Sequence, residues 1–286
     1  MGGEVYELDE NTASLEITMS CNNKCISCPM PSFSSDSPYD HLKKESKKLI
    51  KYDEIHITGG EPTIHKDFFK ILNFLFSNYP NKDFVLVTNG RMLSYDTFCN
   101  KLSRFNFERF LIPLYGTKKI HDEITNVKGS FEQTIRGLKN FNNIKDTMIE
   151  LRVIISKINY SNLEKIANYI VSNLSFVEKV VLFPINIVGF AYQNKDKVFF
   201  KYSDARPYIE SFLSIISKNN LKLELFNYPY CLLNKEYWDY IISSTTVDYK
   251  VSLTDICSNC NKLKDCPKIW KTYLKNIGYP ELKPIK

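Results

Sequence analysis

Three closely spaced cysteines, Cys21, Cys25 and Cys28, have the residue type and spacing to bind an iron-sulfur cluster. They directly follow an apolar segment that has the pattern of a strand. Three thiolates can bind three irons of a cubane cluster, which leaves the fourth iron open to a ligand other than protein. A structural zinc site normally has four closed ligands, and no fourth Cys or His lies within this loop. The spacing therefore predicts chemistry at an open iron.

A second group of cysteines lies near the end of the sequence. Cys257, Cys260 and Cys266 have the spacing Cys-x2-Cys-x5-Cys, and Cys231 precedes them. Four thiols are enough to close one site, and either a cluster or a zinc ion accepts four thiolates. The residues alone therefore leave both metals open. The remaining cysteine, Cys99, is isolated from both groups, and we expect it to be a core thiol of a helix.

Composition excludes several classes of protein. The 286 residues, 43% of them hydrophobic, are enough for one large α/β barrel, with or without a small appendage. No run reaches the roughly eighteen apolar residues of a membrane span, and residues 1–11 are too acidic for a secretory leader. The net charge of +6 comes from scattered lysines, which is a weak argument for nucleic acid. We expect a cytoplasmic protein with neither a membrane nor a nucleic-acid partner.

Short β-rich runs alternate with stretches of helical periodicity. The runs are Leu15–Met19, Glu54–Thr58, Phe84–Thr88, Phe110–Tyr115, Ile149–Ser156 and Val180–Val188. Such alternation implies parallel strands joined by right-handed crossovers. Six units predict an α/β fold, an open, partial (β/α)6 barrel of the TIM type. We place this barrel at residues 1–195 and a small cysteine-rich module at residues 196–286, with a packed junction between them.

Barrels of this kind carry their chemistry at the C-terminal ends of the strands, and several polar or glycine-rich segments fall there. Gly59-Gly60-Glu61-Pro62 follows the second predicted strand, and Thr88-Asn89-Gly90 ends the third. Each segment alone is also compatible with an ordinary turn. Arg152 lies within an otherwise apolar strand, where it needs an anionic partner unless it faces solvent. His56 and His65 flank the glycine segment, and we assign neither a catalytic role.

The cysteine triad together with the Gly-Gly-Glu segment resembles the radical S-adenosylmethionine (SAM) superfamily. The resemblance implies a partial barrel with a [4Fe-4S] cluster on the triad, whose open iron is chelated by the amino and carboxylate groups of SAM. Electron transfer from the reduced cluster then cleaves SAM to a 5′-deoxyadenosyl radical, which abstracts hydrogen from a substrate. Carried over by position, Gly59, Gly60 and Glu61 contact the methionine amino group.

Three further residues are expected at the cofactor, Asn89 and Arg152 by the same resemblance and Tyr115 because its own side chain offers a hydroxyl near the end of the fourth strand. Asn89 shapes the floor of the site, Arg152 binds the methionine carboxylate, and Tyr115 supplies a hydroxyl group. The chain departs from the family pattern at Ser27, where an aromatic residue near the adenine is typical. It departs again at residues 112–116, where relatives often carry Ser or Asp in the fourth strand. Packing on the adenine must therefore come from elsewhere.

The C-terminal cysteines resemble part of the auxiliary-cluster domain called SPASM and its shortened one-cluster form, called twitch. This implies one auxiliary [4Fe-4S] cluster on the four C-terminal cysteines, with zinc less favoured. Enzymes with this arrangement often crosslink, epimerise or oxidise peptides or proteins, and the segments 112–116, 121–124 and 129–131 loosely resemble the maturases of His-Xaa-Ser peptide systems. We therefore expect a peptide maturase that receives electrons from a flavodoxin or ferredoxin.

Only twenty residues precede Cys21, so we expect a leader peptide to be recognised by the barrel or by a separate protein.

Two alternatives to a peptide maturase remain open. The first alternative is a small-molecule dehydrogenase or cyclase of the twitch type. Its nucleotide-cyclising member ends in Gly-Gly, whereas this sequence ends in Pro284-Ile285-Lys286. The second is a non-catalytic, zinc-stabilised barrel, against which the intact triad and Gly-Gly-Glu segment both argue.

Overall fold

The computed structural model describes residues 3–30, 35–142, 147–242 and 250–286. The chain forms two compact units, each built from several segments. Unit 1 consists of Met1–Lys24, Met30–Pro113 and Thr125–Glu150. Unit 2 consists of Cys25–Pro29, Leu114–Ile124 and Leu151–Lys286.

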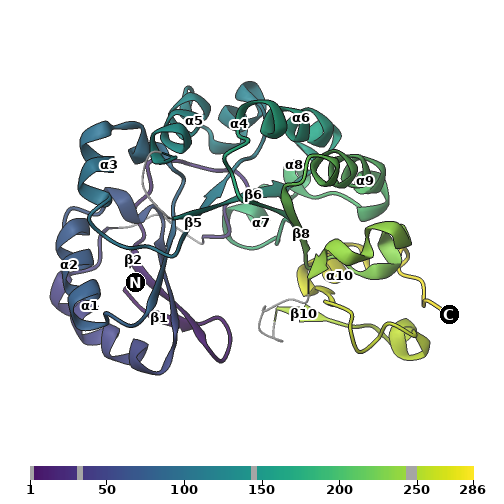
Figure 1. Cartoon of the computed structure of the whole chain (residues 1–286). Coiled ribbons are helices and arrows are strands. Elements are labelled where there is room, and N and C mark those ends of the chain that lie inside the picture. The colour runs from purple at the N-terminus through teal and green to yellow at the C-terminus, as the bar shows by residue number, and fades with distance from the viewer. Residues whose placement is uncertain (1–2, 31–34, 143–146, 243–249) are drawn as a thin grey trace. The chain divides into compact units, whose positions relative to one another are not determined.

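Unit 1 is built on a mostly parallel sheet (Figure 1). Its strands are β1 (Val5–Glu7), β2 (Thr12–Thr18), β3 (Glu54–Gly59), β4 (Asp83–Val87) and β5 (Arg109–Pro113). β1 pairs with β2 in the antiparallel sense, and β2 to β5 pair in parallel. In the register, Ile57 lies between Leu15 on β2 and Leu86 on β4, so buried apolar side chains align across the strands.

Helices and short 3-10 turns connect the strands of unit 1. They are α1 (Tyr39–Glu45), η1 (Ser46–Lys51), η2 (Pro62–Ile64), α2 (Phe68–Asn78), η3 (Arg91–Ser94), α3 (Asp96–Leu102) and α5 (Ser130–Phe141). In α2, buried residues recur at helical spacing, Phe68, Ile71, Leu72 and Leu75, which explains why this stretch packs as a helix. Phe110 of β5 stacks on Phe141 of α5 with 3.9 Å between ring centroids.

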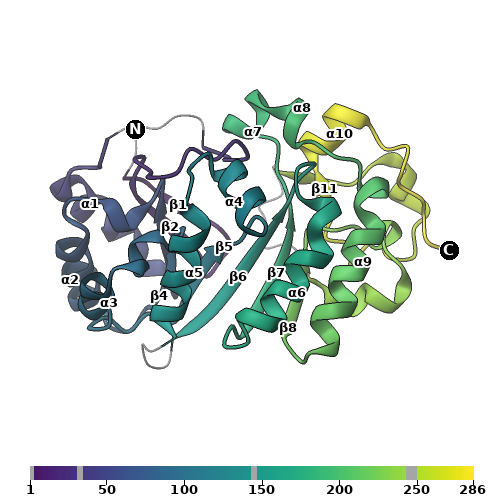
Figure 2. The ribbon, with the colours of Figure 1, turned by 90° about the horizontal axis from the view of Figure 1, so that it is seen from above.

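Unit 2 contains the remaining parallel strands. β6 (Met148–Ile155) begins in unit 1 and continues into unit 2, where β7 (Lys179–Pro184), β8 (Lys222–Phe226) and β9 (Ile241–Ile242) pair in parallel. Figure 2 shows α6 (Leu163–Asn173) and α9 (Tyr202–Lys218) alongside these strands. The other elements are α4 (Lys118–Thr125), η4 (Tyr160–Asn162), α7 (Gly189–Gln193) and α8 (Lys195–Val198).

The C-terminal part of unit 2 is made of short elements. They are η5 (Tyr230–Leu232), η6 (Lys235–Tyr240), β10 (Val251–Ser252), η7 (Asp255–Asn259), β11 (Ile269–Trp270) and α10 (Lys271–Ile277). β10 and β11 form a separate two-stranded antiparallel sheet. Little regular structure therefore surrounds the C-terminal cysteines, and their positions depend on tertiary contacts.

The α/β class and the mostly parallel sheet expected from the sequence are confirmed. All six predicted strands are present as β2 to β7, and β1 to β9 follow chain order in the main sheet. Strand β1, which the sequence analysis did not predict, has only three residues. The division near residue 195 stays a prediction. Among the described residues, no helix combines the length and the apolar character that a membrane span requires.

Candidate cofactor site and cysteine pocket

The loop that carries the cysteine triad belongs to both units, and each half is held by backbone hydrogen bonds. In unit 1, the Asn23 amide donates to the Cys21 sulfur (3.3 Å), and the Lys24 amide donates to the Thr125 carbonyl (3.0 Å). In unit 2, the Cys28 amide donates to the Cys25 carbonyl (3.2 Å).

The unit 2 half of the loop is anchored on both sides of Ser27. The Ile26 amide donates to the Ile124 carbonyl (2.9 Å), and the Ala191 amide donates to the Cys28 carbonyl (2.9 Å). Ser27 is 6% exposed, and its hydroxyl has no hydrogen-bond partner among the described residues. A buried hydroxyl of this kind requires an explanation, because an unsatisfied polar group is costly. A bound group that accepts a hydrogen bond beside the cysteines would satisfy it, so the loop fits the presence of a cofactor.

The Gly-Gly-Glu segment packs directly against the backbone that leads to Cys21. The Gly60 amide donates to the Thr18 carbonyl (2.7 Å), and the Glu61 amide donates to the Ser20 carbonyl (2.8 Å). A Cβ atom at Gly59 would lie 2.1 Å from the Thr18 oxygen, and one at Gly60 would lie 2.2 Å from the Ser20 oxygen. Only glycine permits this approach, which fixes the end of β3 against the start of the cysteine loop.

The Glu61 carboxylate is engaged in hydrogen bonds inside unit 1. The residue is 1% exposed, and its oxygens accept hydrogen bonds from Thr63 N (3.2 Å), Thr63 Oγ1 (2.5 Å), Thr88 Oγ1 (2.6 Å) and Asn89 N (2.6 Å). Burial raises the pKa of Glu61, and these hydrogen bonds act in the opposite direction. Three of these donors share Oε1 and only the Asn89 amide bonds Oε2, so the carboxylate keeps one acceptor position at Oε2, although the residue is almost fully buried.

A polar clamp joins the end of β4 to the cysteine loop, and we define it as Asn89, Arg91 and Gln133. The Asn89 side-chain amide donates to Asn22 Oδ1 (2.6 Å), and the Arg91 amide donates to Asn89 Oδ1 (3.0 Å). The Arg91 guanidinium donates to Gln133 Oε1 (2.6 Å), to Asn23 Oδ1 (2.8 Å) and to the Asn22 carbonyl. The sequence predicted a role at this site for Asn89 but not for Arg91. The feature that points to Arg91 in the sequence is its position directly after Asn89-Gly90, near the end of a strand.

Two of the predicted cofactor-binding residues lie in unit 2. Arg152 on β6 is half-buried, and its guanidinium carbon lies 5.5 Å from the ring centroid of Phe183, which stacks on Phe226 at 4.1 Å. The Tyr115 carbonyl accepts a hydrogen bond from Asn159 Nδ2 (2.8 Å), and its ring lies 5.6 Å from that of His121. The roles predicted for Arg152 and Tyr115 stay predictions.

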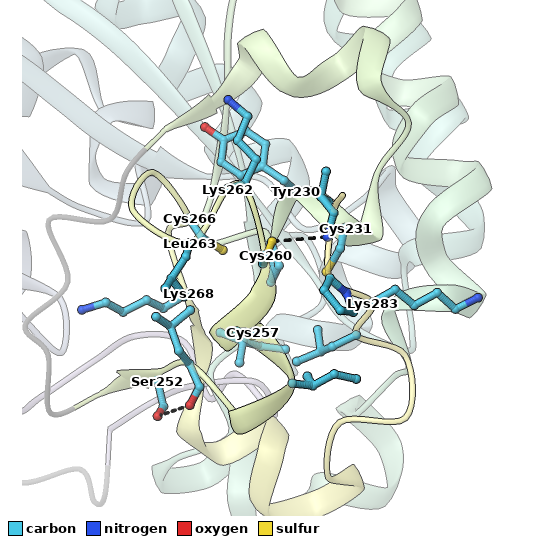
Figure 3. A pocket seen from close by; sticks show the side chains of 17 residues that line it. Tyr230, Cys231, Ser252, Cys257, Cys260, Lys262, Leu263, Cys266, Lys268 and Lys283 are labelled. Carbon is cyan, nitrogen blue, oxygen red and sulfur yellow. Dashed lines mark hydrogen bonds between the residues drawn. The ribbon is translucent and has the colours of Figure 1, made fainter.

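The four C-terminal cysteines line one pocket of unit 2 (Figure 3). Cys231 lies on η5, Cys257 on η7, Cys260 directly after η7, and Cys266 in the irregular segment before β11. Much of the remaining lining is apolar, namely Leu253, Ile256, Leu263, Ile269, Leu282 and Ile285. Four thiols on one pocket fit a group bound by four thiolates. No three Cys, His, Asp or Glu side chains in the described ranges, however, meet at the spacing of ligands around a single metal ion.

Backbone and hydroxyl groups are directed at these sulfurs. The Ile285 amide donates to the Cys260 sulfur (3.3 Å), shown as a dashed line in Figure 3, and Thr254 Oγ1 lies 3.5 Å from the Cys257 sulfur. Burial raises the pKa values of Cys231 and Cys266, which backbone hydrogen bonds partly oppose. Metal binding would therefore have to displace protons from these two thiols.

Cys99 lies apart from both cysteine groups, as the sequence predicted. It is buried on α3, and its sulfur donates to the Leu93 carbonyl (3.0 Å). Burial raises its pKa to about 11. Cys99 is therefore a neutral core thiol and a useful reference for the other seven cysteines.

Comparison with known sequences finds one family and two kinds of relatives. The family described as "Radical SAM superfamily" matches residues 15–170. A probable GTP 3′,8-cyclase of Sulfurisphaera tokodaii is 26% identical over 256 residues, which cover 87% of this chain and 75% of the cyclase. The mycofactocin maturase MftC of Mycolicibacterium smegmatis is 27% identical over 158 residues, which cover 53% of this chain and 39% of the maturase.

Solved structures share the fold. SuiB of Streptococcus suis, bound to precursor peptide SuiA, aligns with a TM-score of 0.59 and 16% identity over 77% of this chain. The enzyme anSMEcpe, with bound AdoMet and Kp18Cys peptide, aligns with a TM-score of 0.57 and 18% identity over 74% of this chain. The alignments cover 49% and 62% of those two chains, so this chain spans about half the length of SuiB.

Proposed function

The protein belongs to the radical SAM superfamily, whose match covers more than half of the chain, and from this premise we propose that it abstracts hydrogen from a peptide or protein substrate. Members of the superfamily are enzymes that use a [4Fe-4S] cluster and SAM. The outcome that we propose is a crosslink, an epimerisation or an oxidation of the substrate. We keep the cytoplasm as its proposed location.

One observation carries the proposal most strongly, namely the close packing of Gly59 and Gly60 on the backbone before Cys21. Their missing Cβ atoms allow contacts that no other residue permits. This packing fixes the cysteine loop relative to the ends of β3 and β4, where the family carries its cofactor site.

Each residue of the site has a proposed role. Cys21, Cys25 and Cys28 hold the cluster, and the reduced cluster, when bound, supplies the electron that cleaves SAM to methionine and the 5′-deoxyadenosyl radical. The segment Gly59–Glu61, whose backbone packs against the start of the cysteine loop, binds the methionine amino group. Arg152 binds the methionine carboxylate.

Two roles are less direct. Asn89 shapes the floor of the site by holding Asn22, and Tyr115 offers its hydroxyl to the cofactor. The Ser27 hydroxyl takes up a hydrogen bond to the bound cofactor, in place of the aromatic contact that is typical of the family.

The C-terminal pocket holds an auxiliary [4Fe-4S] cluster in this proposal. Cys231, Cys257, Cys260 and Cys266 supply four thiolates, which is a complete ligand set. A complete set leaves no iron for the substrate, so this cluster transfers electrons or stabilises the tail. Zinc in the same pocket is the competing assignment, and metal analysis distinguishes the two.

The peptide substrate is supported by the similarity to MftC and by the fold shared with SuiB and anSMEcpe. A second candidate is a small-molecule reaction of the cyclase type. One observation favours it, since the GTP 3′,8-cyclase likeness covers 87% of this chain and the MftC likeness only 53%. Flavodoxin or ferredoxin is the proposed reductant, and a separate protein is the proposed leader-recognition partner.

The first experiment tests cofactor cleavage. The protein is reconstituted anaerobically with iron and sulfide, given SAM and dithionite, and assayed for 5′-deoxyadenosine by mass spectrometry. We expect formation by the wild type and none above the enzyme-free background by Cys28→Ala. Equal formation by both would overturn the role of the triad.

The second experiment decides the substrate class by deuterium transfer. An extract from cells grown in heavy water is divided by dialysis into macromolecules and small molecules, and deuterated GTP is a third probe. We expect deuterated 5′-deoxyadenosine from the macromolecular fraction, with the transfer lost after protease treatment. Transfer from GTP or from the small molecules alone would move the assignment to the second candidate.

A further inference from the structure

Arg91 contacts the cysteine loop more extensively than any residue that the sequence pattern singled out in unit 1. It is the first residue of η3 and directly follows Asn89-Gly90, in the short segment after β4. Its Nη1 atom donates to Asn23 Oδ1 (2.8 Å) and to the Asn22 carbonyl. Asn22 and Asn23 lie between Cys21 and Cys25, so this guanidinium is bonded to the loop within two residues of a proposed cluster ligand.

The guanidinium is itself held in one orientation. Its Nε atom donates to Gln133 Oε1 on α5 (2.6 Å), and its backbone amide donates to Asn89 Oδ1 (3.0 Å). Thr134 Oγ1, also on α5, donates to the Asn89 carbonyl (3.0 Å). A planar guanidinium with Nε and Nη1 both engaged loses its rotational freedom, so Arg91 orders Asn22 and Asn23 against two fixed elements.

The charge of Arg91 is not matched by an acid in this network. Its acceptors in the described part of the chain are a carbonyl and two side-chain amides, all neutral. A guanidinium stays protonated at every pH that a protein tolerates. An oxidised [4Fe-4S] core with three thiolates is already anionic, and reduction adds a further negative charge. A cation on the loop therefore favours the reduced state of a cluster bound there.

We propose that Arg91 is a positioning residue of the radical SAM site, which orders the first half of the cysteine loop and uses its unpaired charge to ease reduction of the cluster. The inference rests on the proposed function, because it requires a cluster on the triad. Its two parts are separable. Ordering of the loop depends on the guanidinium hydrogen bonds to Asn22, Asn23 and Gln133, whereas the electrostatic effect depends on the charge alone.

Two variants and one control separate these parts. Arg91→Lys keeps the charge and loses the fork, Arg91→Gln loses both, and Arg104→Gln removes the charge of an exposed arginine of the same unit. In the apoprotein, hydrogen exchange of the Lys24 amide reports loop order, because this amide is bonded to the Thr125 carbonyl. We expect about tenfold faster exchange in both Arg91 variants and no change in the control.

The electrostatic part is measured in the reconstituted protein by redox titration of the EPR signal that changes when SAM is added. A unit charge about 10 Å from a redox centre, at an effective dielectric constant of about 20, alters the equilibrium on the order of tenfold. We expect Arg91→Gln to lower the ratio of reduced to oxidised cluster about tenfold at a fixed potential, a shift of about 59 mV for one electron. Arg91→Lys and the control should stay close to the wild type.

Each arm can overturn its part of the proposal. Unchanged exchange in both Arg91 variants would exclude the ordering role, and reduction of Arg91→Gln as easily as the wild type would exclude the electrostatic role. Equal shifts of the reduction potential in Arg91→Lys and Arg91→Gln would also exclude the electrostatic role. Such shifts would result from the lost hydrogen bonds, because Arg91→Lys keeps the charge. Absence of a SAM-sensitive EPR signal in the wild type would overturn the proposed function instead. Hydrogen exchange in the apoprotein would still show whether Arg91 orders the cysteine loop.

Discussion

The two cysteine groups of this protein are held in contrasting ways. The first part of the triad loop is fixed from outside by polar side chains, with Asn89 and Arg91 bonded to Asn22 and Asn23. The C-terminal cysteines instead line a pocket with many apolar neighbours, where backbone amides are directed at the sulfurs. Side chains of distant residues support the first group in addition to backbone hydrogen bonds, whereas the second group lies mainly among apolar side chains and backbone amides.

This difference matches the chemistry proposed for each group. Three thiolates leave the fourth iron of a cubane cluster open to a ligand that comes and goes with each turnover. Four thiols in an apolar pocket suit a group that stays bound. The count of cysteines and their surroundings therefore lead to the same assignment of an open site and a closed one.

The sharpest test of this contrast removes one cysteine from each group. Cys28→Ala should reduce SAM cleavage to background, whereas Cys260→Ala should retain cleavage and lose product. In each variant the iron content should fall from about eight to about four per chain. Cys99→Ala, which removes a core thiol from α3, is the control for destabilisation alone. Loss of SAM cleavage in Cys260→Ala, with Cys99→Ala active, would contradict the separation of roles.

The second prediction concerns the glycines that fit the cysteine loop to the sheet. In Gly60→Ala the new Cβ atom would lie 2.2 Å from the Ser20 oxygen and 2.7 Å from the Met19 oxygen. Both are backbone atoms that cannot turn away, so we expect a loss of about 3 kcal/mol or more in the free energy of unfolding. Denaturation by urea measures it.

Gly129→Ala is the matched control for Gly60→Ala. Gly129 has a φ of +83°, but a Cβ atom there would meet nothing within 4 Å. Its cost should be the conformational one alone, about 1 kcal/mol. Gly60 does not have a positive φ, so a loss in Gly60→Ala no larger than the loss in Gly129→Ala would contradict the steric cost of the close approach to Ser20.

The third prediction uses the buried carboxyl of Glu61. Its pKa is raised by burial, so the folded protein binds a proton there more tightly than the unfolded chain. The stability that this group contributes is therefore fully present below its usual pKa, 4.5, and is lost as the pH rises through the folded value. Unfolding of the wild type should show this decline, and unfolding of Glu61→Gln should not.

Glu61→Gln also lowers the free energy of unfolding by an amount that does not depend on pH. The amide nitrogen of Gln, in place of Oε2, would face the Asn89 amide, which is also a donor, and one unsatisfied buried group costs about 1–3 kcal/mol. Glu108→Gln, at an exposed position, is the control. A stability difference between wild type and Glu61→Gln that does not change with pH would show that Glu61 does not titrate in this range.

The sequence predicted those parts of the molecule that depend on local pattern. Alternation of apolar residues located β2 to β7, and spacing alone identified the triad and the C-terminal group. Glu61 was found by motif, but its carboxylate lies inside the protein because it meets Thr88 and Asn89, which are separated from it by 27 and 28 positions.

The sequence did not reveal contacts that depend on distant partners. Arg91 donates to Asn22, 69 positions away, and to Asn23, 68 positions away. The local pattern of apolar and polar residues carries no information about such distant pairs. Strand β1 escaped prediction because three residues are too few for alternation to be recognised. Polar clamps and short edge strands are therefore the features for which coordinates were needed.

The last and smallest effect concerns the main chain at the closed site. Ile285→Pro removes the amide that donates to the Cys260 sulfur at 3.3 Å, whereas Ile285→Ala retains it. One hydrogen bond contributes about 1 kcal/mol, so the ratio of reduced to oxidised auxiliary cluster should fall about fivefold in the Pro variant only. Redox titration followed by EPR in the Cys28→Ala background measures this cluster alone. Equal potentials in the Pro and Ala variants would show that amides directed at the sulfurs do not tune the closed site, and iron-free protein with stoichiometric zinc would make the pocket purely structural.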